Sequence, residues 1–210
     1  AVRSAQLAHC LIEIGDQVFW ILDADAEPDQ PVLQPGAASF CRTDVGNRAS
    51  IDALIDHAVA RFGAVDVMYN NAGVSGVPRR FLKDTLADFE QVVSVSLLGA
   101  MLGSQAAARQ MVAQGTGGAI VNTASLAGIT PGAGVMSYRV AKAGVVHFTR
   151  CLALELAEHR IRVNAVAPAN IATAINAQFD MTRTIEMTQP LPTAGTPADA
   201  AQAALFLASD

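Results

Sequence analysis

The sequence has few aromatic residues, few charged residues and no excess of positive charge. Aromatic side chains make up 5% of the 210 residues and charged side chains 16%, whereas apolar residues make up 51%. A chain of this length and composition can bury a substantial core and is not of the kind that stays disordered. Its formal net charge of −5 argues against nucleic acid and anionic membranes as partners, because both require a basic surface.

Cysteine is scarce, and no metal-binding pattern is visible. Cys10, Cys41 and Cys151 are odd in number and far apart, and no histidine has ligand spacing with them. This pattern predicts reduced thiols rather than a disulfide framework or a metal site. The first residues lack the pattern of a secretion signal, and no apolar run reaches the roughly 18–20 residues of a membrane span. We therefore expect a cytoplasmic protein without a metal and without a membrane partner.

Strand-like and helix-like stretches alternate along the chain. Residues 18–22 form a continuous apolar run, which is typical of a strand buried on both faces. Further strands are predicted over 39–41, 65–69, 119–124 and 161–166. Helices are predicted over 3–14, 49–62, 85–114, 136–159 and 196–209. This alternation predicts one α/β domain over 1–210, built on a doubly wound parallel sheet.

Two of the predicted helices begin with capping signals. Thr85 and Asp88 have the spacing of a capping box, which is expected to open the helix that reaches 114. At the last helix, Thr196 is a cap residue, Pro197 stands at the first position and Asp199 lies in the first turn. Parallel sheets bind ligands at the carboxyl ends of their strands, and the polar motifs of this chain fall at such ends.

Tyr138 and Lys142 lie four residues apart on the helix predicted over 136–159, so their side chains share one face. A phenol has a pKa of about 10, and a neighbouring cation lowers it toward a neutral working pH. The pair is therefore suited to carry a proton, although pairs at this spacing also form for helix stability alone. Ser125 follows the preceding strand, where its hydroxyl can bind a substrate oxygen or merely start a loop.

Together with two further motifs, these three residues resemble the motif set of the short-chain dehydrogenases/reductases. The motifs are Asn-Asn-Ala-Gly at 70–73 and Arg-Val-Asn-Ala-Val-Ala-Pro at 162–168. The resemblance extends over nearly the whole chain. It implies a Rossmann-like fold and an NAD(P)-dependent oxidoreductase that transfers a hydride between nicotinamide and a secondary alcohol or ketone.

The resemblance also implies roles for single residues. Tyr138 would donate or accept the proton, Lys142 would bind the nicotinamide ribose and lower the pKa of the phenol, and Ser125 would orient the substrate oxygen. The cofactor contacts that the resemblance implies are Asp23, Asp44, Val45, Asn71, Ala72, Gly73, Tyr138, Lys142, Pro168, Ile171 and Thr173.

Asp23 is the residue expected to select the cofactor. It follows the strand predicted over 18–22, where a carboxylate can accept hydrogen bonds from the adenosine ribose and would repel a 2′-phosphate. NAD is therefore favoured over NADP. The open alternatives are that Asp25 takes this role, or that Asp23 is only a solvated loop carboxylate.

Two positions depart from the family pattern. Ser96 stands where the family has an asparagine that stabilises a helix bend and holds a proton-relaying water, and Ala169 replaces the glycine after Pro168. Both departures favour one alternative, a sensor or scaffold that binds cofactor without turnover. A second alternative is a lyase like the halohydrin dehalogenases, which carry arginine four residues after the tyrosine, where this chain has Lys142.

Several expectations concern parts outside these motifs. The first strand with its glycine-rich turn and the last strand are missing, so we expect the sequence to be incomplete at both ends. Apolar residues on more than one face of the helices over 86–114 and 136–159 favour a homotetramer or homodimer. The stretch 174–191 is a candidate lid with few charges, which suits an apolar small-molecule substrate. The sequence does not identify the alcohol or ketone.

Overall fold

The computed structural model describes residues 18–22, 38–173, 175 and 180–209. The helix predicted over 3–14 and the residues Cys10, Asp23, Asp25 and Phe179 lie outside the described residues.

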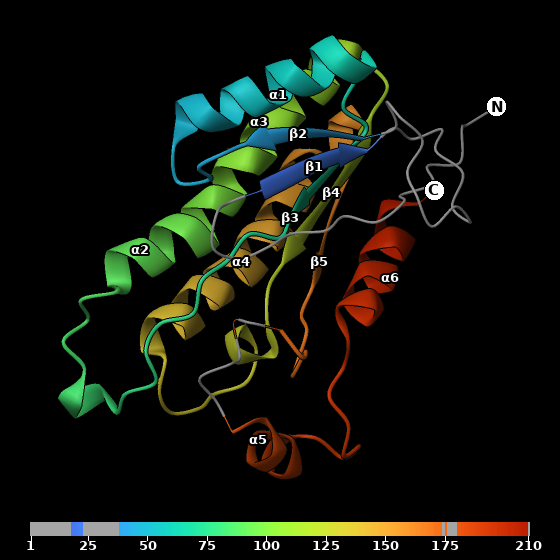
Figure 1. The fold of residues 1–210 in the computed structure, drawn as a ribbon. Coiled ribbons are helices and arrows are strands. Elements are labelled where there is room, and N and C mark those ends of the chain that lie inside the picture. The colour runs from blue at the N-terminus through green and yellow to red at the C-terminus, as the bar shows by residue number, and fades with distance from the viewer. Residues whose placement is uncertain (1–17, 23–37, 174, 176–179, 210) are drawn as a thin grey trace.

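The centre of the fold is a parallel sheet of three strands in the order β3-β4-β5 (Figure 1). The strands are β3 (Val67–Asn70), β4 (Gly118–Thr123) and β5 (Ile161–Val166). Asn70 of β3 pairs with Asn122 of β4, so the carboxyl ends of the strands lie at one edge. The parallel sheet predicted from the sequence is thereby confirmed, with bounds that differ by no more than two residues.

Helices cover both faces of this sheet, as expected for a doubly wound fold. Successive strand residues point to opposite faces. Ile120 accordingly packs in the cluster that includes α1 (Arg48–Phe62) and α3 (Gly99–Gln114), whereas Val121 packs against α6 (Pro197–Ala208). Figure 1 shows α6 on the opposite side of the strands from these helices.

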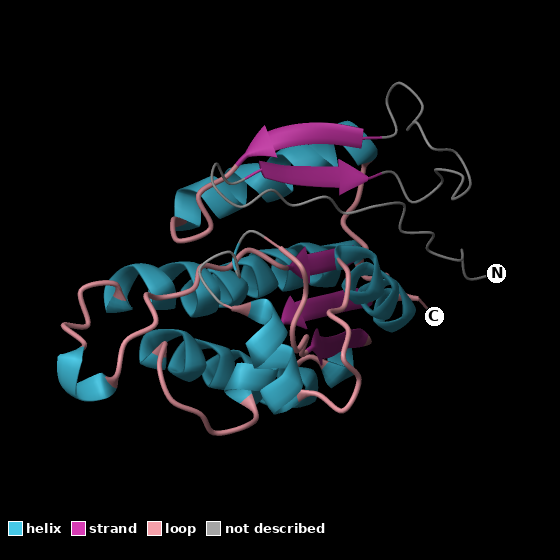
Figure 2. Ribbon diagram, turned by 60° about the horizontal axis from the view of Figure 1, so that its bottom comes forward, coloured by secondary structure: helices cyan, strands magenta, loops and turns pink. Residues whose placement is uncertain are grey.

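Two strands pair differently from the prediction. β1 (Val18–Leu22) and β2 (Ala38–Arg42) form a separate, antiparallel sheet, which Figure 2 shows apart from the other three strands. Parallel neighbours need a crossover connection, usually a helix. The link between these two strands, with Pro28, Pro31 and Pro35, lies outside the described residues.

The long helical region begins later than the predicted capping box. α2 (Phe89–Val93) starts after Asp88, which makes no capping hydrogen bond, and Leu86 has a left-handed φ of 55°. The carboxylate of Asp88 instead accepts a hydrogen bond of 2.8 Å from the amide of Val77. The prediction of a capping box at Thr85 was wrong because a tertiary contact takes up the carboxylate.

The same helical region continues through a π-helical turn (Ser94–Leu98) into α3. Over residues 89–114 it is long and apolar enough to cross a membrane by length and composition, the one such stretch among the described residues. The expectation that no stretch meets this criterion was therefore wrong. More than half of its most apolar window is buried, and Ala107 and Met111 are fully buried against the sheet, as in a core helix.

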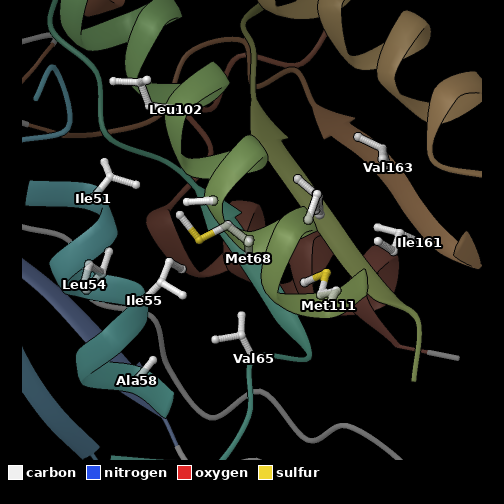
Figure 3. Close-up of a cluster of buried hydrophobic side chains, with 14 of the residues drawn as sticks. Ile51, Leu54, Ile55, Ala58, Val65, Met68, Leu102, Met111, Ile161 and Val163 are labelled. Atoms are coloured by element: carbon white, nitrogen blue, oxygen red, sulfur yellow. The ribbon is translucent and has the colours of Figure 1, made fainter. Parts of the chain in front are cut away.

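The main core lies between α1, α3 and the sheet (Figure 3). Ile51 and Leu54 of α1 and Leu102 and Met111 of α3 all belong to this buried cluster. At Gly103 the helix approaches β3 so closely that an added Cβ would collide with the amide oxygen of Asn70. Only glycine fits this contact without a shift of its neighbours.

A polar network crosses the core at the ends of β3 and β4. The amide nitrogen of Asn70 donates to Asn122 at 2.8 Å and to Ser104 at 3.0 Å, and the amide of Asn122 donates to Thr149 at 3.0 Å. All four residues are buried. Buried polar groups are stabilising only when they are hydrogen-bonded, so the network fixes how α3 and α4 (Met136–Glu155) sit on the sheet.

The helix ends follow the sequence signals in the remaining cases. Gly63 ends α1 with a left-handed φ of 86°. Thr196 and Asp199 form the predicted capping box of α6, with proline at its start. α4 ends at Glu155, and a 3-10 turn (Ala157–His159) completes the helix predicted to reach 159. The candidate lid contains α5 (Met181–Thr188), which is capped by Asp180.

Candidate active site

Three predicted site residues meet where β4 ends. Ser125 follows the strand and is buried, and it lies close enough to the side chain of Tyr138, in the first turn of α4, to lower the pKa of its phenol. Lys142 lies one turn further along α4, with its Nζ 5.8 Å from the centre of the Tyr138 ring. Tyr138 and Lys142 share one face of α4, and the loop before this helix brings Ser125 to them.

The phenol of Tyr138 is harder to ionise than expected. Burial raises the pKa of Tyr138 above its ordinary value, while the hydrogen bond with Ser125 acts in the opposite direction and is the weaker effect. Desolvation of the phenolate is the larger of these two effects. The ammonium of Lys142 is directed to a backbone carbonyl, and the role of its charge in lowering this pKa stays a prediction.

Lys142 is a buried cation, with 2% of its surface exposed. Its Nζ donates a hydrogen bond of 2.6 Å to the carbonyl oxygen of Thr123, the last residue of β4. Burial lowers the pKa of Lys142 to about 8. The side chain is therefore still mostly charged at neutral pH. Neutral pH lies only slightly below this pKa, so a small rise in pH removes the proton.

Thr123 joins the lysine to the turn at the end of β3. Its hydroxyl donates to the amide oxygen of Asn71 at 2.8 Å and lies 3.1 Å from the hydroxyl of Tyr69, from which it can accept. One strand residue thus holds Lys142 through its carbonyl and Asn71 through its side chain. Sequence reasoning did not single out Thr123, and its position two residues before Ser125 was the available signal.

Gly73 lies directly over the buried lysine. A Cβ added at this position would lie 3.3 Å from Nζ of Lys142 and 3.6 Å from Oγ of Ser96. The glycine therefore keeps the space beside the ammonium open. Asn71, Ala72 and Gly73 are each partly exposed, and Gly73 is the residue of this turn that lies beside Lys142.

Ser96 sits in the π-helical turn and is buried. Its hydroxyl accepts from the amide of Val74 and donates to the carbonyl of the same residue, both at 3.1 Å. Because a serine hydroxyl has one proton, this double contact leaves it no further donor. Through these two hydrogen bonds, Ser96 connects the π-helical turn to Val74, the residue that follows Gly73.

The loop between Ser125 and Tyr138 is held by Arg139, which sequence reasoning missed. The guanidinium donates to the carbonyl oxygens of Thr130 at 3.2 Å, Gly134 at 3.2 Å and Ala127 at 3.4 Å. The loop ends at Val135, the N-cap of α4, which has a left-handed φ of 44°. No local signal in the sequence indicated this role.

The segment after β5 borders the same site. The carbonyl oxygen of Pro168 accepts a hydrogen bond of 2.9 Å from the amide of Leu126, which ties this segment to the loop after Ser125. Ile171 forms a parallel bridge with Gly195, and the hydroxyl of Thr173 donates to the carbonyl of Ile171 at 3.5 Å. The three residues are partly exposed.

The residues expected at the adenine end lie after β2. Asp44 is exposed, and its side chain accepts from the amide of Gly46 at 2.9 Å. The side chain of Val45 is buried against Gly99 rather than open to a ligand. Asp23, the expected cofactor selector, and Asp25 lie outside the described residues. In the part of the chain that the structure describes, no group of three His, Cys, Asp or Glu side chains has the geometry of a metal site.

Comparison with known proteins gives a consistent result. A family model described as enoyl-(acyl carrier protein) reductase matches residues 5–210. The chain is 46% identical over 187 residues to momilactone A synthase of Oryza sativa subsp. japonica, covering 85% of this chain and 68% of that protein. It is 39% identical over 175 residues to cis-4-hydroxycyclohexanecarboxylate dehydrogenase of Sinomonas cyclohexanicum, covering 82% and 70%.

The fold has a similar counterpart among solved structures. A short-chain type dehydrogenase/reductase from Mycobacterium marinum superposes with a TM-score of 0.75 at 36% sequence identity. The superposition covers 80% of this chain and 67% of that chain.

Proposed function

This chain belongs to the short-chain dehydrogenase/reductase family, and we propose that Tyr138 is the proton carrier of its reaction. The chain is an oxidoreductase acting on alcohols or ketones, and family members use a nicotinamide cofactor. The observation that carries the proposal is the placement of the buried ammonium of Lys142 over the Tyr138 ring, 5.8 Å from its centre, with the buried Ser125 close enough to lower the pKa of the phenol.

The residues around Lys142 fit a nicotinamide ribose. Gly73 leaves space beside Nζ that a larger residue would fill, and Asn71 is oriented there by its bond from Thr123. Lys142 and this turn would hold the ribose, and Pro168, Ile171 and Thr173 would lie beside the carboxamide. When bound, the cofactor supplies or accepts the hydride.

The proton transfer requires only two hydroxyl groups and a cation. In the reducing direction, the O–H bond of Tyr138 breaks and its proton passes to the substrate oxygen, which Ser125 orients by a hydrogen bond. The phenolate that remains is stabilised by the positive charge of Lys142. In the oxidising direction the same proton returns from the alcohol to the phenolate.

A tyrosine variant tests this assignment. Turnover of alcohols from a panel should fall by about 10²–10⁴-fold in Tyr138→Phe, which keeps the ring but removes the proton. Binding of NADH, followed by fluorescence titration, should change little in the same variant. Unchanged turnover would refute the role of Tyr138, and cofactor binding without any turnover in the wild type would favour the sensor alternative.

The cofactor is proposed to be NAD rather than NADP. The support is the sequence position of Asp23, whose carboxylate would repel a 2′-phosphate. The wild type should bind NADH more tightly than NADPH. Asp23→Ser should reduce this preference, whereas Asp25→Ser should not. A loss of preference only in Asp25→Ser would assign selection to the second aspartate.

The substrate is proposed to be a secondary alcohol on an apolar ring, or the matching ketone. One relative is named for cis-4-hydroxycyclohexanecarboxylate, a ring alcohol that also carries a carboxylate. Apolar side chains lie exposed on the loops and helix near the strand ends, among them Val77, Ile129 and Met187. A panel that contrasts cyclohexanol with 2-hexanol, and each with a charged sugar acid, tests this preference. Selective oxidation of the sugar acid would contradict it.

A homodimer or homotetramer built on the outer faces of α3 and α4 is also proposed. Leu154 of α4 is 82% exposed, and Val140, Leu98 and Met101 are exposed as well. Leu154→Glu should lower the mass measured by sedimentation. Leu82→Glu, at an even more exposed leucine outside these helices, should not. A wild-type monomer would contradict the proposal.

A further inference from the structure

Arg139 binds backbone rather than carboxylates. In the described part of the chain, no ion pair is seen for its guanidinium, and its hydrogen bonds go to the carbonyls of Ala127, Thr130 and Gly134. Side chains that donate to several carbonyls of one loop fix its shape, because each contact would have to break before the loop moves. The loop in question runs from Ser125 to Tyr138, the two residues whose hydroxyls must meet.

The end of this loop has an unfavourable backbone conformation. Val135 has a φ of 44°, and left-handed backbone is a genuine outlier for a β-branched residue. Such a conformation persists only when its surroundings hold it, and it is found most often near active sites. Two hydrogen bonds lie beside it: the backbone amide of residue 139 donates to the carbonyl of Val135 at 3.0 Å, as in any first helical turn, and Nε of the Arg139 side chain donates to the carbonyl of Gly134 at 3.2 Å.

The loop also contacts α4 at a second point. A Cβ added to Gly128 would lie 2.5 Å from the carbonyl carbon of Lys142, so the loop backbone packs directly on the helix at the lysine. The loop is therefore placed against α4 by close packing beside Lys142 and by hydrogen bonds beside Tyr138. Of these two contacts, only the one at Arg139 is made by a side chain that can be removed.

We propose that Arg139 is a positioning residue, which sets the distance and orientation between the hydroxyls of Ser125 and Tyr138 by holding the loop between them. The inference rests on the proposed function of these two residues. Arg139 itself need not touch the substrate or the cofactor. Small displacements of reacting groups reduce rates strongly, so a side chain outside the reaction centre can control it in this way.

Gly132 offers an independent way to disturb the same contact. A Cβ added there would collide with Nη2 of Arg139, and the backbone of Gly132 has no left-handed φ. Gly132→Ala should therefore displace the guanidinium without straining the loop itself. If Arg139 acts as proposed, this substitution should have its effect only while the arginine is present.

The experiment is a double-mutant cycle with kinetic readouts. Arg139→Met and Gly132→Ala should each lower kcat/KM for the best alcohol of the panel by about tenfold or more, with little change in the KM for NAD. The double variant should be no worse than Arg139→Met. Arg139→Lys should recover part of the rate, and Arg150→Met, at an exposed arginine of the same helix, should behave like the wild type.

A second measurement needs neither substrate nor cofactor. Amide hydrogen exchange in residues 126–135 should become faster in Arg139→Met and Gly132→Ala, and stay unchanged in Arg150→Met. Additive effects in the cycle, or wild-type exchange in this loop, would overturn the proposal. Loss of turnover in Tyr138→Phe together with wild-type rates in Arg139→Met would leave the proposed function standing and remove the role of Arg139.

Discussion

Nζ of Lys142 lies 2.6 Å from the carbonyl oxygen of Thr123, so the buried ammonium of α4 is bound to the last residue of β4. One carbonyl replaces only part of the water that a lysine binds in solution, and burial lowers the pKa of Lys142 to about 8. This contact thus joins α4 to β4, and the pKa of the lysine involved lies close to neutral pH.

This contact predicts that stability depends on pH in alkaline solution. Between about pH 8 and the ordinary pKa of 10.5, the unfolded lysine keeps its proton while the folded lysine loses it. The unfolded state then binds more protons, so the free energy of unfolding rises with pH. From about pH 8 to about pH 10 the contribution of this one group should be about 2 kcal/mol.

Urea unfolding of the wild type and of Lys142→Met, at several pH values in this window, checks the prediction. The difference between the two proteins should grow in favour of the wild type as the pH increases. The window ends near pH 10 because the raised pKa of Tyr138 acts with the opposite sign above it. A difference that stays constant would show that Lys142 does not lose its proton in the folded state.

Ser125→Ala is expected to change the pH dependence of the reaction as well as its rate. The hydrogen bond from Ser125 is the influence that lowers the pKa of Tyr138 against burial. Its removal should raise this pKa further and shift the alkaline rise of alcohol oxidation to higher pH. The rate should fall by about 10²-fold at neutral pH. A rate loss without a shift would limit Ser125 to substrate orientation.

Gly103→Ala is expected to destabilise the fold by about 1–3 kcal/mol, because the new methyl group collides with Asn70 inside the polar network. Gly144→Ala is the matched control in another helix, where the new Cβ meets only the flexible end of Leu97 at 3.0 Å. It should change stability by less than about 1 kcal/mol. Urea midpoints distinguish the two, and equal effects would contradict the close approach at Gly103.

The carboxylate of Asp88 is expected to join two segments near the site. It accepts from the amide of Val77 at 2.8 Å and from the hydroxyl of Ser137 at 3.3 Å. Asp88→Ala should cost about 1–3 kcal/mol of stability, because both donors lose their acceptor. Asp88→Asn should cost less, since its oxygen can serve Val77 and the serine hydroxyl can turn to accept from its amide. Thermal or urea unfolding gives the order, and the reverse order would refute this assignment.

The sequence predicted those features that depend on local signals. The strand over 161–166 has the predicted bounds, and the glycine at 63 and the capping box at Thr196 lie where their residue types place them. Ser125, Tyr138 and Lys142 were predicted together because spacing and family resemblance agree on them. Their meeting at one strand end follows from the parallel sheet.

Features that depend on contacts between distant residues could not be predicted in this way. Asp88 looked like a capping residue because its spacing from Thr85 is right, but its carboxylate is taken by Val77. The hydrogen bond from Lys142 to the carbonyl oxygen of Thr123 was not predicted either, because it joins a helix to the strand before it. Nothing local in the sequence reveals that Arg139 reaches back to three carbonyls.

The residues at the end of β4 limit which substitutions this protein can accept. Within four residues, Asn122 holds the core network, Thr123 holds the lysine and Ser125 faces the proton carrier. A substitution there alters foldability and catalysis at once, so few variants should survive selection. The loop that starts at Val74 does not combine these two roles along most of its length. Libraries meant to broaden the range of accepted alcohols should therefore be directed to this loop, with the strand end and the loop held by Arg139 left intact.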